Sequence, residues 1–427
     1  MKESLSRNIE TPCFIVKGIE DNQCQRCGYQ IKATDYDDFS RKYCPSCEAY
    51  GFIDESSVLF RYERKVEIKK HELSLKFSLS EAQKQASQFL LHQIMTHQKC
   101  VLHAVCGAGK TEILYESLLY GLNQGWRLCL AIPRTDIVKE LTLRLQKRFP
   151  DSIIKELHQY AKDDSFAHIL VSTIHQLIHY YQEFDIIFLD EADAFPFRGN
   201  PFLNRIIRKA LKPQGHLIEM SATIDQPMAK RISKEKIKTF VLPARFHRQH
   251  LDQFHIEYVS QLDSFVKKRN SLPSPLKNWL QDLLNSHHQA LLFVPTKAWG
   301  QWLEKAMADS GFHCESVHSM DLNKNYKIKC FRDRQIPFLI STTLLERGIT
   351  IKGIHIGILN ASHPIFDEFT LIQMAGRVGR HKDQPHGEIV LFTEMRTTAI
   401  ENAKKYVKRM NTDAIKKGLI DNDLPSL

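Results

Sequence analysis

Short apolar runs alternate with longer segments of helical periodicity along most of the chain. In the first part of the chain these runs lie at 101–105, 128–132, 168–172, 185–189 and 216–220. A second set lies at 290–294, 337–341, 354–359 and 388–392. Strands that alternate with helices are typical of parallel sheets with helices packed on their faces. The pattern therefore predicts an α/β protein with two parallel sheets in tandem.

The last segment, 397–418, has a helical pattern of its own. Its apolar positions fall on one helical face, namely Ile400, Ala403, Val407, Met410 and Ala414. Lysine and arginine occupy the other faces. Such a segment is more typical of a packing helix with a solvated face than of a binding element.

Length and composition divide this pattern into domains. A chain of 427 residues accommodates about three domains of ordinary size. We predict a small N-terminal module with a linker at 1–65, whose cysteines are considered below, a first α/β domain at 66–248 and a second at 249–427. Hydrophobic residues make up 43% of the chain and charged residues 25%, as in globular rather than disordered proteins. The formal charge of +10 favours a polyanionic partner such as nucleic acid, although a merely basic surface would have the same charge.

The N-terminus and the hydropathy predict a cellular location. No cleavable apolar leader opens the chain, and no apolar run reaches the roughly 18 residues of a membrane-spanning helix. We therefore expect a cytosolic protein without a transmembrane segment, in which the ten cysteines do not form disulfides.

Four of those cysteines have the spacing of a metal site. CQRC at 24–27 and CPSC at 44–47 are two C-x2-C pairs separated by 16 residues. Two such turns facing each other supply Cys24, Cys27, Cys44 and Cys47 as four thiolates for a closed, structural Zn²⁺ site. Basic and aromatic residues around both pairs fit a zinc ribbon whose face touches nucleic acid or a partner. The alternative is two unrelated turns with free thiols, and Cys13 stands outside the pattern.

The segment HAVCGAGKTEI, 103–113, joins a β-prone run to a helical pattern over 110–122. Glycine at this junction lets backbone N–H groups approach an anion closely. The cradle consists of Gly107, Ala108 and Gly109, followed by Lys110, which reaches terminal phosphates, and Thr111, which holds Mg²⁺. The alternative is a glycine-rich turn in some other α/β unit.

A second element, FDIIFLDEADAF at 184–195, is an apolar strand that ends in consecutive acids. Asp190 is suited to bind Mg²⁺ through coordinated water, and Glu191 is suited to position or deprotonate the attacking water. An acidic turn after a buried strand is the alternative. Together the two elements predict ATP and Mg²⁺ as cofactors, in addition to the structural zinc.

The strings AVCGAGKT (104–111) and DEAD (190–193) resemble those of superfamily 2 helicases and translocases, and further matches follow in that family's order. SAT at 221–223 resembles the motif that links the ATP state to the grip on nucleic acid, and STTLLERGIT at 341–350 resembles the fifth motif. QMAGRVGR at 373–380 resembles the sixth motif, which starts here at Gln373. Its Arg377 and Arg380 would act as fingers on the transferring phosphate.

The same resemblance implies two RecA-like domains with the nucleotide between them and nucleic acid across the other side of the cleft. Upstream, FSLSEAQKQAS at 77–87 resembles the adenine-reading segment, with Gln83 on the base, or else is an ordinary helix start. Candidate contacts to the nucleic-acid backbone follow strand ends: Pro133, Arg134, Ser172, Thr173, Thr296, Ser341 and Thr342. Hydroxyl and backbone donors hold phosphates without reading bases. Each Ser or Thr taken alone is equally well explained as a helix cap.

Two details oppose an RNA-remodelling helicase of the DEAD type: Gln373 stands where those enzymes usually have His, and the LLERGIT string lacks their Asp. The four-cysteine module, GAGKTE, TTLLERGIT and QMAGRVGR together resemble the competence ComFA family over roughly residues 20 to 395. A resemblance to the primosomal replication-restart helicase is also visible, but that family keeps its cysteines in the second lobe. Cys106 departs from the Thr or Ser common at its position.

Membership of the ComFA family would imply an ATPase stimulated by single-stranded DNA, which acts at the inner face of the membrane to draw transforming DNA through a channel. It would also imply competence-protein partners, namely a phosphoribosyltransferase-like protein, a DNA-processing protein that loads recombinase, and a membrane DNA channel. An ATP-gated clamp or platform on nucleic acid is the non-enzymatic alternative. The presence of Glu191 together with Arg377 and Arg380 argues against an inactive ATPase.

Overall fold

The computed structural model describes residues 1–5, 13–63, 69–161, 163, 165–346 and 351–420. The end of the fifth-motif string, 347–350, lies outside the described residues. The chain forms two compact units, one of Met1–Ala104 with Lys110–Val241 and one of Val105–Gly109 with Leu242–Leu427. None of the described helices combines the length and the apolar character that a membrane crossing needs.

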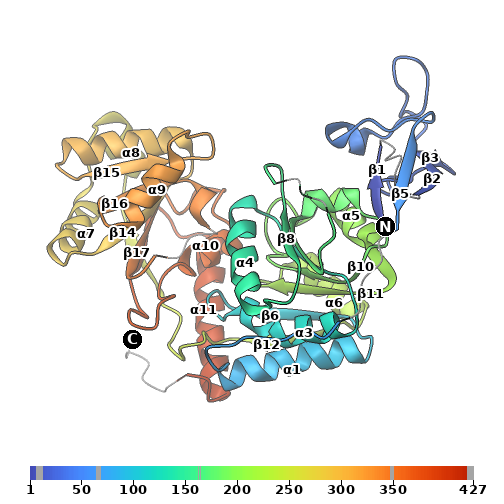
Figure 1. The fold of residues 1–427 in the computed structure, drawn as a ribbon. Helices are drawn as coiled ribbons and strands as arrows, with labels where there is room; N and C mark the ends of the chain where they lie inside the picture. Colours follow the sequence, from blue (N-terminus) through green and yellow to red (C-terminus); the bar gives the residue numbers. More distant parts are fainter. Residues whose placement is uncertain (6–12, 64–68, 162, 164, 347–350, 421–427) are drawn as a thin grey trace. The chain divides into compact units, whose positions relative to one another are not determined.

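The first unit contains a seven-stranded sheet in the order β12-β6-β11-β10-β7-β9-β8. Its strands are β6 (Cys100–Ala104), β7 (Leu128–Ile132), β8 (Ile154–Leu157), β9 (Ile169–Thr173), β10 (Phe184–Leu189), β11 (Leu211–Ser221) and β12 (Lys238–Leu242). From β6 to β8 the neighbouring strands pair in parallel. Its helices are α1 (Glu81–Met95), α2 (Lys110–Ile113), α3 (Tyr115–Asn123), α4 (Thr135–Arg148), η2 (Ile174–His179), α5 (Pro201–Ala210) and α6 (Gln226–Lys234) (Figure 1).

The same unit carries an N-terminal module, which comprises β1–β5 and η1 and is blue in Figure 1. Its antiparallel sheet has the order β1-β5-β2, from β1 (Lys2–Ser4), β2 (Cys13–Lys17) and β5 (Val58–Tyr62). A hairpin of β3 (Ile19–Glu20) with β4 (Gln23–Cys24) and the short helix η1 (Pro45–Tyr50) complete it.

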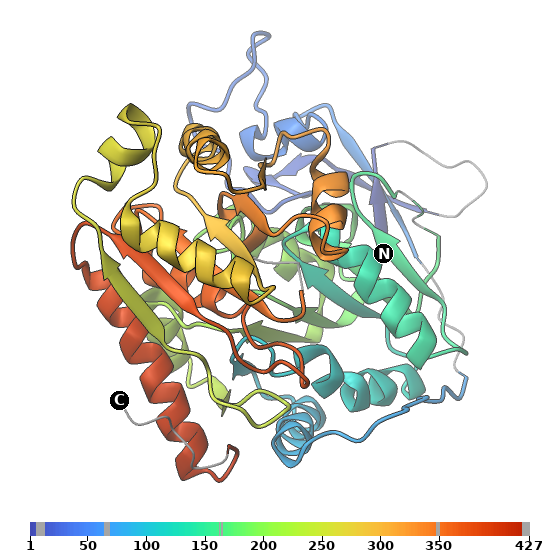
Figure 2. The ribbon, with the colours of Figure 1, turned by 90° about the vertical axis from the view of Figure 1, so that its left-hand side faces the viewer.

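The second unit contains a six-stranded, fully parallel sheet in the order β13-β18-β17-β14-β16-β15. The strands are β13 (Phe254–Tyr258), β14 (Gln289–Phe293), β15 (Cys314–Val317), β16 (Phe338–Ser341), β17 (Ile354–Leu359) and β18 (Ile389–Thr393). The helices are η3 (Ser264–Lys268), α7 (Ser274–Asn285), α8 (Lys297–Asp309), α9 (Lys324–Arg332), η4 (Thr343–Glu346), α10 (Glu368–Ala375) and α11 (Thr398–Lys416). The long helix α11 is the red element of Figure 2. Its five predicted apolar residues are buried.

Every apolar run that predicted a strand overlaps one, so the expected α/β fold with two parallel sheets and a four-cysteine module is confirmed. The four strands of the large sheets that the pattern missed are β8, β12, β13 and β15. All four are edge strands, and each has several half-exposed residues. An edge strand has one neighbour only, and its sequence lacks the continuous apolar run of a central strand.

One hydrophobic core joins the N-terminal module to a face of the first sheet. Alternate residues of adjacent strands, Cys129 and Ala131 of β7 with Ile187 and Leu189 of β10, pack in the same cluster as the four zinc-motif cysteines. Apolar residues of η2 and α5 lie between them. Because side chains alternate across a strand, this face of the sheet is covered by α5, η2 and the module together.

Candidate nucleotide, nucleic-acid and metal sites

The predicted phosphate cradle forms the turn between β6 and α2. All five residues of β6 are buried, and the turn contains Gly107 at φ 81° and Gly109 at φ 76°. Both angles lie in the left-handed region, which favours glycine. The helix predicted over 110–122 is divided at Leu114, whose N–H bonds to the carbonyl of Thr111, three residues back rather than four. Lys110 and Thr111 therefore begin a separate helical turn next to the cradle.

The acidic pair stands at the carboxyl end of β10. The backbone N–H of Asp190 donates to the Ala131 carbonyl of β7 at 3.0 Å, which continues the sheet pairing to this residue. The next residue, Glu191, has φ 54° and donates its N–H to Asp190 Oδ1 at 2.8 Å. Lys110 Nζ lies 3.8 Å from the same oxygen. The cradle lysine and the predicted magnesium carboxylate thus meet in one unit.

Burial and the neighbouring Lys110 have opposite effects on the pKa of Asp190. Burial raises the pKa of this carboxyl, the Lys110 ammonium lowers it, and Glu191 and Asp193 raise it again. A carboxylate in such surroundings gains from a further cation. The oxygen donors of Asp190 and Thr111 suit Mg²⁺, and Gly107, Ala108, Gly109 and Lys110 suit the phosphates of ATP.

The third acid of DEAD has a role that the sequence did not indicate. Asp193 is 5% exposed, and its Oδ2 accepts a hydrogen bond from the Thr223 hydroxyl at 2.5 Å. Thr223 belongs to the SAT string, in which the Ser221 hydroxyl donates to the Thr223 carbonyl. The strand β11 lies beside β10, so adjacent strand ends bring these two motifs together. In the sequence, the presence of both DEAD and SAT was the one sign that these residues are related.

The sixth motif lies in α10 and the turn after it, in the second unit. Gln373 and Arg377 are each 3% exposed, and Arg380 Nε donates to the Gly376 carbonyl at 2.7 Å. The Gly379 carbonyl accepts from Arg245 Nη1 at 3.1 Å. It also accepts from His247 Nε2 at 2.8 Å. Neither of these two residues was singled out from the sequence, because no local pattern marks a residue that supports a distant turn.

The side chain of Gln83 helps to cap the N-terminus of α1. Ser80 is the N-cap of α1, and its hydroxyl accepts from the Gln83 N–H at 3.3 Å while Gln83 Oε1 accepts from the Ser80 N–H at 3.0 Å. This reciprocal arrangement is a capping box. The side chain predicted to read adenine is therefore also part of the helix start.

The predicted nucleic-acid contacts lie at strand ends or just after them, and they differ in burial: Ser172 and Thr173 end β9 and Ser341 ends β16, so these three are strand residues and not loop residues. Ser172 and Ser341 are 0% and 1% exposed, and Pro133 and Thr173 are also buried. Arg134 and Thr342 are half-buried. Thr296 is the N-cap of α8, and its hydroxyl accepts from the Trp299 N–H at 3.1 Å. Where side chains are buried, only the backbone at these positions can face a phosphate.

The four cysteines of the N-terminal module converge. Each is 0% exposed, and their sulfur atoms all lie within 4.8 Å of one another. The Sγ–Sγ distances are 3.8 Å for Cys24 to Cys47 and 3.5 Å for Cys27 to Cys44. A tetrahedron with Zn–S bonds of about 2.3 Å has edges of about 3.8 Å. The four thiols therefore fit a closed zinc site, and Cys13 lies outside it, half-buried.

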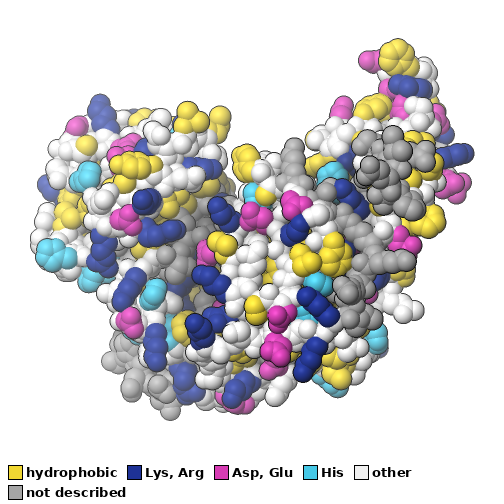
Figure 3. Space-filling view, in the orientation of Figure 1, with side chains coloured by type: hydrophobic (Ala, Val, Ile, Leu, Met, Phe, Trp, Pro, Cys, Tyr) yellow, Lys and Arg dark blue, Asp and Glu magenta, His cyan; other side chains and the backbone are white. Residues whose placement is uncertain are grey.

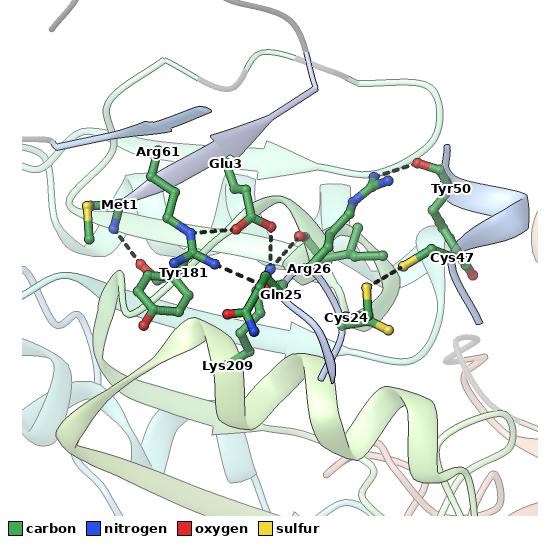
Figure 4. A network of polar contacts seen from close by, with 12 residues as sticks. Met1, Glu3, Cys24, Gln25, Arg26, Cys47, Tyr50, Arg61, Tyr181 and Lys209 are labelled. Carbon is green, nitrogen blue, oxygen red and sulfur yellow. Dashed lines mark hydrogen bonds and ion pairs between the residues drawn. The ribbon is translucent and has the colours of Figure 1, made fainter. Parts of the chain in front are cut away.

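Polar contacts attach this module to the first sheet (Figure 4). Glu3 accepts from Arg61 Nε at 2.8 Å and from Lys209 Nζ at 2.5 Å. Arg26, between two zinc-motif cysteines, donates to the Gly51 carbonyl at 3.1 Å and to the Tyr50 carbonyl at 2.5 Å. The bond from Lys209 of α5 and the shared core hold the module on the first unit, whereas the bonds of Arg61 and Arg26 lie within the module.

Known proteins resemble the chain in both sequence and fold. A family described as "Type III restriction enzyme, res subunit" matches residues 76–226, and "Helicase conserved C-terminal domain" matches residues 275–382. The competence protein ComFA of Bacillus subtilis (strain 168) is 34% identical over 408 residues, which cover 92% of this chain and 86% of that protein. ComFA of Streptococcus pneumoniae is 31% identical over 397 residues, with 92% and 90% covered.

Among solved structures, S. cerevisiae Dbp5 bound to RNA and ADP BeF3 superposes with a TM-score of 0.55 at 16% identity. The superposition covers 80% of this chain and 96% of that one, and at this identity it shows the tandem fold alone. The matches to two ComFA proteins are of another kind, because each covers 92% of this chain at more than 30% identity. The chain therefore belongs to the ComFA family of competence proteins and, with its two helicase-type matches, to the ATPases of helicase superfamily 2.

Proposed function

We propose that the protein couples ATP hydrolysis to movement along single-stranded DNA, in the uptake of transforming DNA during competence. The observation that supports this most directly is the cluster at the ends of β6 and β10, where Lys110 Nζ lies 3.8 Å from Asp190 Oδ1. The bond from Thr223 to Asp193 supports the coupling, because it joins this cluster to a second strand end. The ComFA relatives support DNA, rather than RNA, as the track.

The residues divide the chemistry among them. Lys110 and the backbone of the glycine turn hold the phosphates, while Asp190 and Thr111 hold Mg²⁺, which supplies positive charge to the phosphate oxygens when bound. Glu191 orients the attacking water and takes its proton. In this proposal Gln373, Arg377 and Arg380 act on the transferring phosphate from the second domain. Charge that spreads over the phosphoryl oxygens is stabilised by planar guanidinium groups.

The proposed organisation is a zinc-binding module and linker at 1–65, a first RecA-like domain at 66–248 and a second at 249–427. The backbone-contacting loops would bind single-stranded DNA without reading its sequence. We place the protein in the cytoplasm at the inner face of the membrane. Its partners there would be a phosphoribosyltransferase-like competence protein, a DNA-processing protein and a membrane DNA channel.

A turnover assay with a panel of nucleic acids tests the proposal. ATP hydrolysis is measured without nucleic acid and with single-stranded DNA, duplex DNA and single-stranded RNA. Displacement of streptavidin from a biotinylated strand end then separates a motor from a clamp. We expect stimulation by single-stranded DNA and ATP-dependent displacement. If only RNA stimulates hydrolysis, the protein moves along RNA and not DNA. Turnover without displacement of streptavidin would favour the ATP-gated clamp.

Variants locate the activity in the cluster. Lys110→Ala is expected to lose about 10²–10³-fold in turnover, as for the loss of one charge-stabilising donor, and Arg377→Ala about 10³–10⁵-fold. Glu191→Gln should keep ATP binding and lose hydrolysis. Lys139→Ala, an exposed lysine on α4, is the matched control and should turn over normally. Normal hydrolysis by Lys110→Ala would end the proposal.

A further inference from the structure

A groove of about 860 Å³ lies in the first unit between the N-terminal module and the carboxyl ends of β7 and β9. Lys2, Glu3 and Tyr50 line it from the module, Pro133 lines it just after β7, and Thr173 lines it at the end of β9. Its volume is toward the upper end of the roughly 300–1,000 Å³ of ligand sites. The carboxyl ends of parallel strands are where open α/β sheets bind ligands. The groove is thus continuous with the strand ends proposed to hold the DNA backbone.

The walls of this groove suit an anion. Among the described residues that line the groove, Glu3 alone has a carboxylate, and it is 3% exposed. Its two oxygens are bonded to Arg61 and Lys209 (Figure 4), so the three side chains together carry a net positive charge. Lys2, half-buried on the neighbouring position of β1, adds a second positive charge. A polyanion in the groove therefore meets no uncompensated negative charge from the wall.

Aromatic rings provide a second kind of contact. The Tyr50 ring lies 6.1 Å from the His175 ring at an interplanar angle of 17°, and 5.4 Å from the Phe202 ring at 25°. Tyr50 and His175 both line the groove and are half-buried. Burial lowers the pKa of His175, which favours the neutral imidazole. A short ladder of π faces thus stands beside the cations.

Charge alone does not mark such a site. Figure 3 shows Lys and Arg side chains spread over the visible face of both units among acidic side chains. The groove is distinguished by the combination of a compensated carboxylate, a lysine and stacked rings at a strand-end loop. Phosphates that follow a basic groove while bases stack on aromatic rings are the pattern of single-strand binding. A duplex keeps its bases stacked on one another and offers no free faces to the ladder.

We infer that this groove binds single-stranded DNA and leads the strand from the carboxyl ends of β7 and β9 onto the N-terminal module. The inference rests on the proposed function and names a part of its track. Lys2 pairs with a phosphate, and a base stacks on the ladder that contains Tyr50 and His175. The zinc site then serves to hold η1, and with it Tyr50, at the groove.

Fluorescence anisotropy with a labelled oligodeoxythymidine tests the inference on the full chain. Tyr50→Ala and His175→Ala are each expected to weaken binding by about 5- to 150-fold, the range for the loss of one stacked base. Lys2→Gln should lower the slope of log affinity against log salt by about 0.7, one phosphate on a single strand. Zinc content and melting temperature identify any variant that fails to fold, and His175→Ala, outside the module, leaves the zinc ligands and η1 in place.

The matched control is Phe39→Ala, an aromatic side chain of the same module that is 79% exposed and does not line the groove. We expect it to bind like the unmodified protein. If Phe39→Ala weakens binding and the groove variants do not, the strand crosses another face and the inference is overturned. If affinity is unchanged in all variants while DNA still stimulates turnover, the groove is not the binding site, and the proposed function stands. Absence of DNA binding by the unmodified protein removes both the groove and the proposed function.

Discussion

The two ends of the first sheet carry the same kinds of charged side chain but pack them differently. At the amino end, Arg127 and Glu183 immediately precede the neighbouring strands β7 and β10, and Arg127 Nη1 lies 2.7 Å from Glu183 Oε1 with both side chains under 5% exposed. At the carboxyl end, Lys110 Nζ and Asp190 Oδ1 are 3.8 Å apart, and these side chains are 16% and 24% exposed.

Close contact and full burial make the first pair part of the structure, since two desolvated charges must stay together. The wider pair is partly solvated, so polar atoms of both side chains stay accessible to a ligand. A pair of one basic and one acidic side chain therefore contributes to the structure at one end of the sheet, and at the other end belongs to the site that we propose for ATP and Mg²⁺. If burial and not position decides this, polar clusters elsewhere in the chain should follow the same division.

The four clustered cysteines extend the comparison to a third polar group, which is fully buried in the core of the first unit. Cys47→Ser should lose the metal, and with it a large part of a binding free energy on the order of 10 kcal/mol. We expect less than about one zinc per chain and a lower melting temperature, because the cysteines share the core of the sheet. Metal analysis and thermal unfolding measure both.

Cys13→Ser is the control for the cysteine change, since Cys13 is half-buried on β2. It should keep both zinc and melting temperature. A Cys47→Ser protein with full zinc would show that the cluster is not the metal site. A metal-free protein with unchanged melting would show that burial alone does not predict a stabilising role.

The buried pair at the amino end should give the next largest effect. Arg127→Met leaves the buried Glu183 carboxylate with the N-terminal ammonium of Met1 as a remaining cation. It should lower the free energy of unfolding by about 3 kcal/mol, the lower end for breaking a buried pair, measured by urea titration. Turnover per folded molecule should be unchanged. Lys110→Ala should show the reverse, with turnover lost and unfolding little affected.

The control at the same end is Lys212→Met, which breaks the bond to Asp185 at 2.8 Å. The Lys212 side chain is 42% exposed, so the change should be worth less than about 1 kcal/mol. Equal losses for Arg127→Met and Lys212→Met would contradict the importance of burial.

Short sequence patterns were enough to predict the structures that depend on neighbouring residues alone. The central strands, the cysteine turns, the glycine turn and the acidic strand end were all predictable, because each is a short run with a strict physical requirement. What escaped prediction depends on partners distant in sequence. The edge strands lack a continuous apolar run, Asp193 acquires its role from Thr223 on the next strand, and Arg245 supports Gly379. The attachment of the zinc module through Glu3 and Lys209 likewise joins residues that no motif relates.

The amino end also contains a group that should make stability depend on pH. His168 is 4% exposed, and burial, with His71, Lys69 and Arg127 nearby, lowers its pKa to about 4. Its Nδ1 accepts a hydrogen bond from the Ile153 N–H at 2.9 Å, which requires the neutral ring. The unfolded chain binds the proton near pH 6.5. Stability from this group is therefore present above about pH 6.5 and lost as the pH falls toward 4, by up to about 3 kcal/mol.

Urea unfolding at a series of pH values, with and without His168→Asn, measures this contribution. The Oδ1 of asparagine keeps an acceptor at the position of Nδ1 for the Ile153 N–H, but asparagine does not titrate. The difference between the two proteins should shrink from neutral pH toward pH 4. A difference that is constant over this range would show that His168 is not held neutral by its surroundings.

The smallest expected effect concerns Gln83, where structure and ligand binding would use one side chain. Ser80→Ala and Gln83→Ala each remove one side of the capping box of α1 and should cost about 0.5–2 kcal/mol of stability. If Gln83 also reads adenine, only Gln83→Ala raises the KM for ATP relative to that for GTP. Turnover assays with both nucleotides decide this, with the serine variant as the control for the helix start. A selectivity change shared by both variants would assign the effect to the position of α1, and no change in either would leave Gln83 as a capping residue alone.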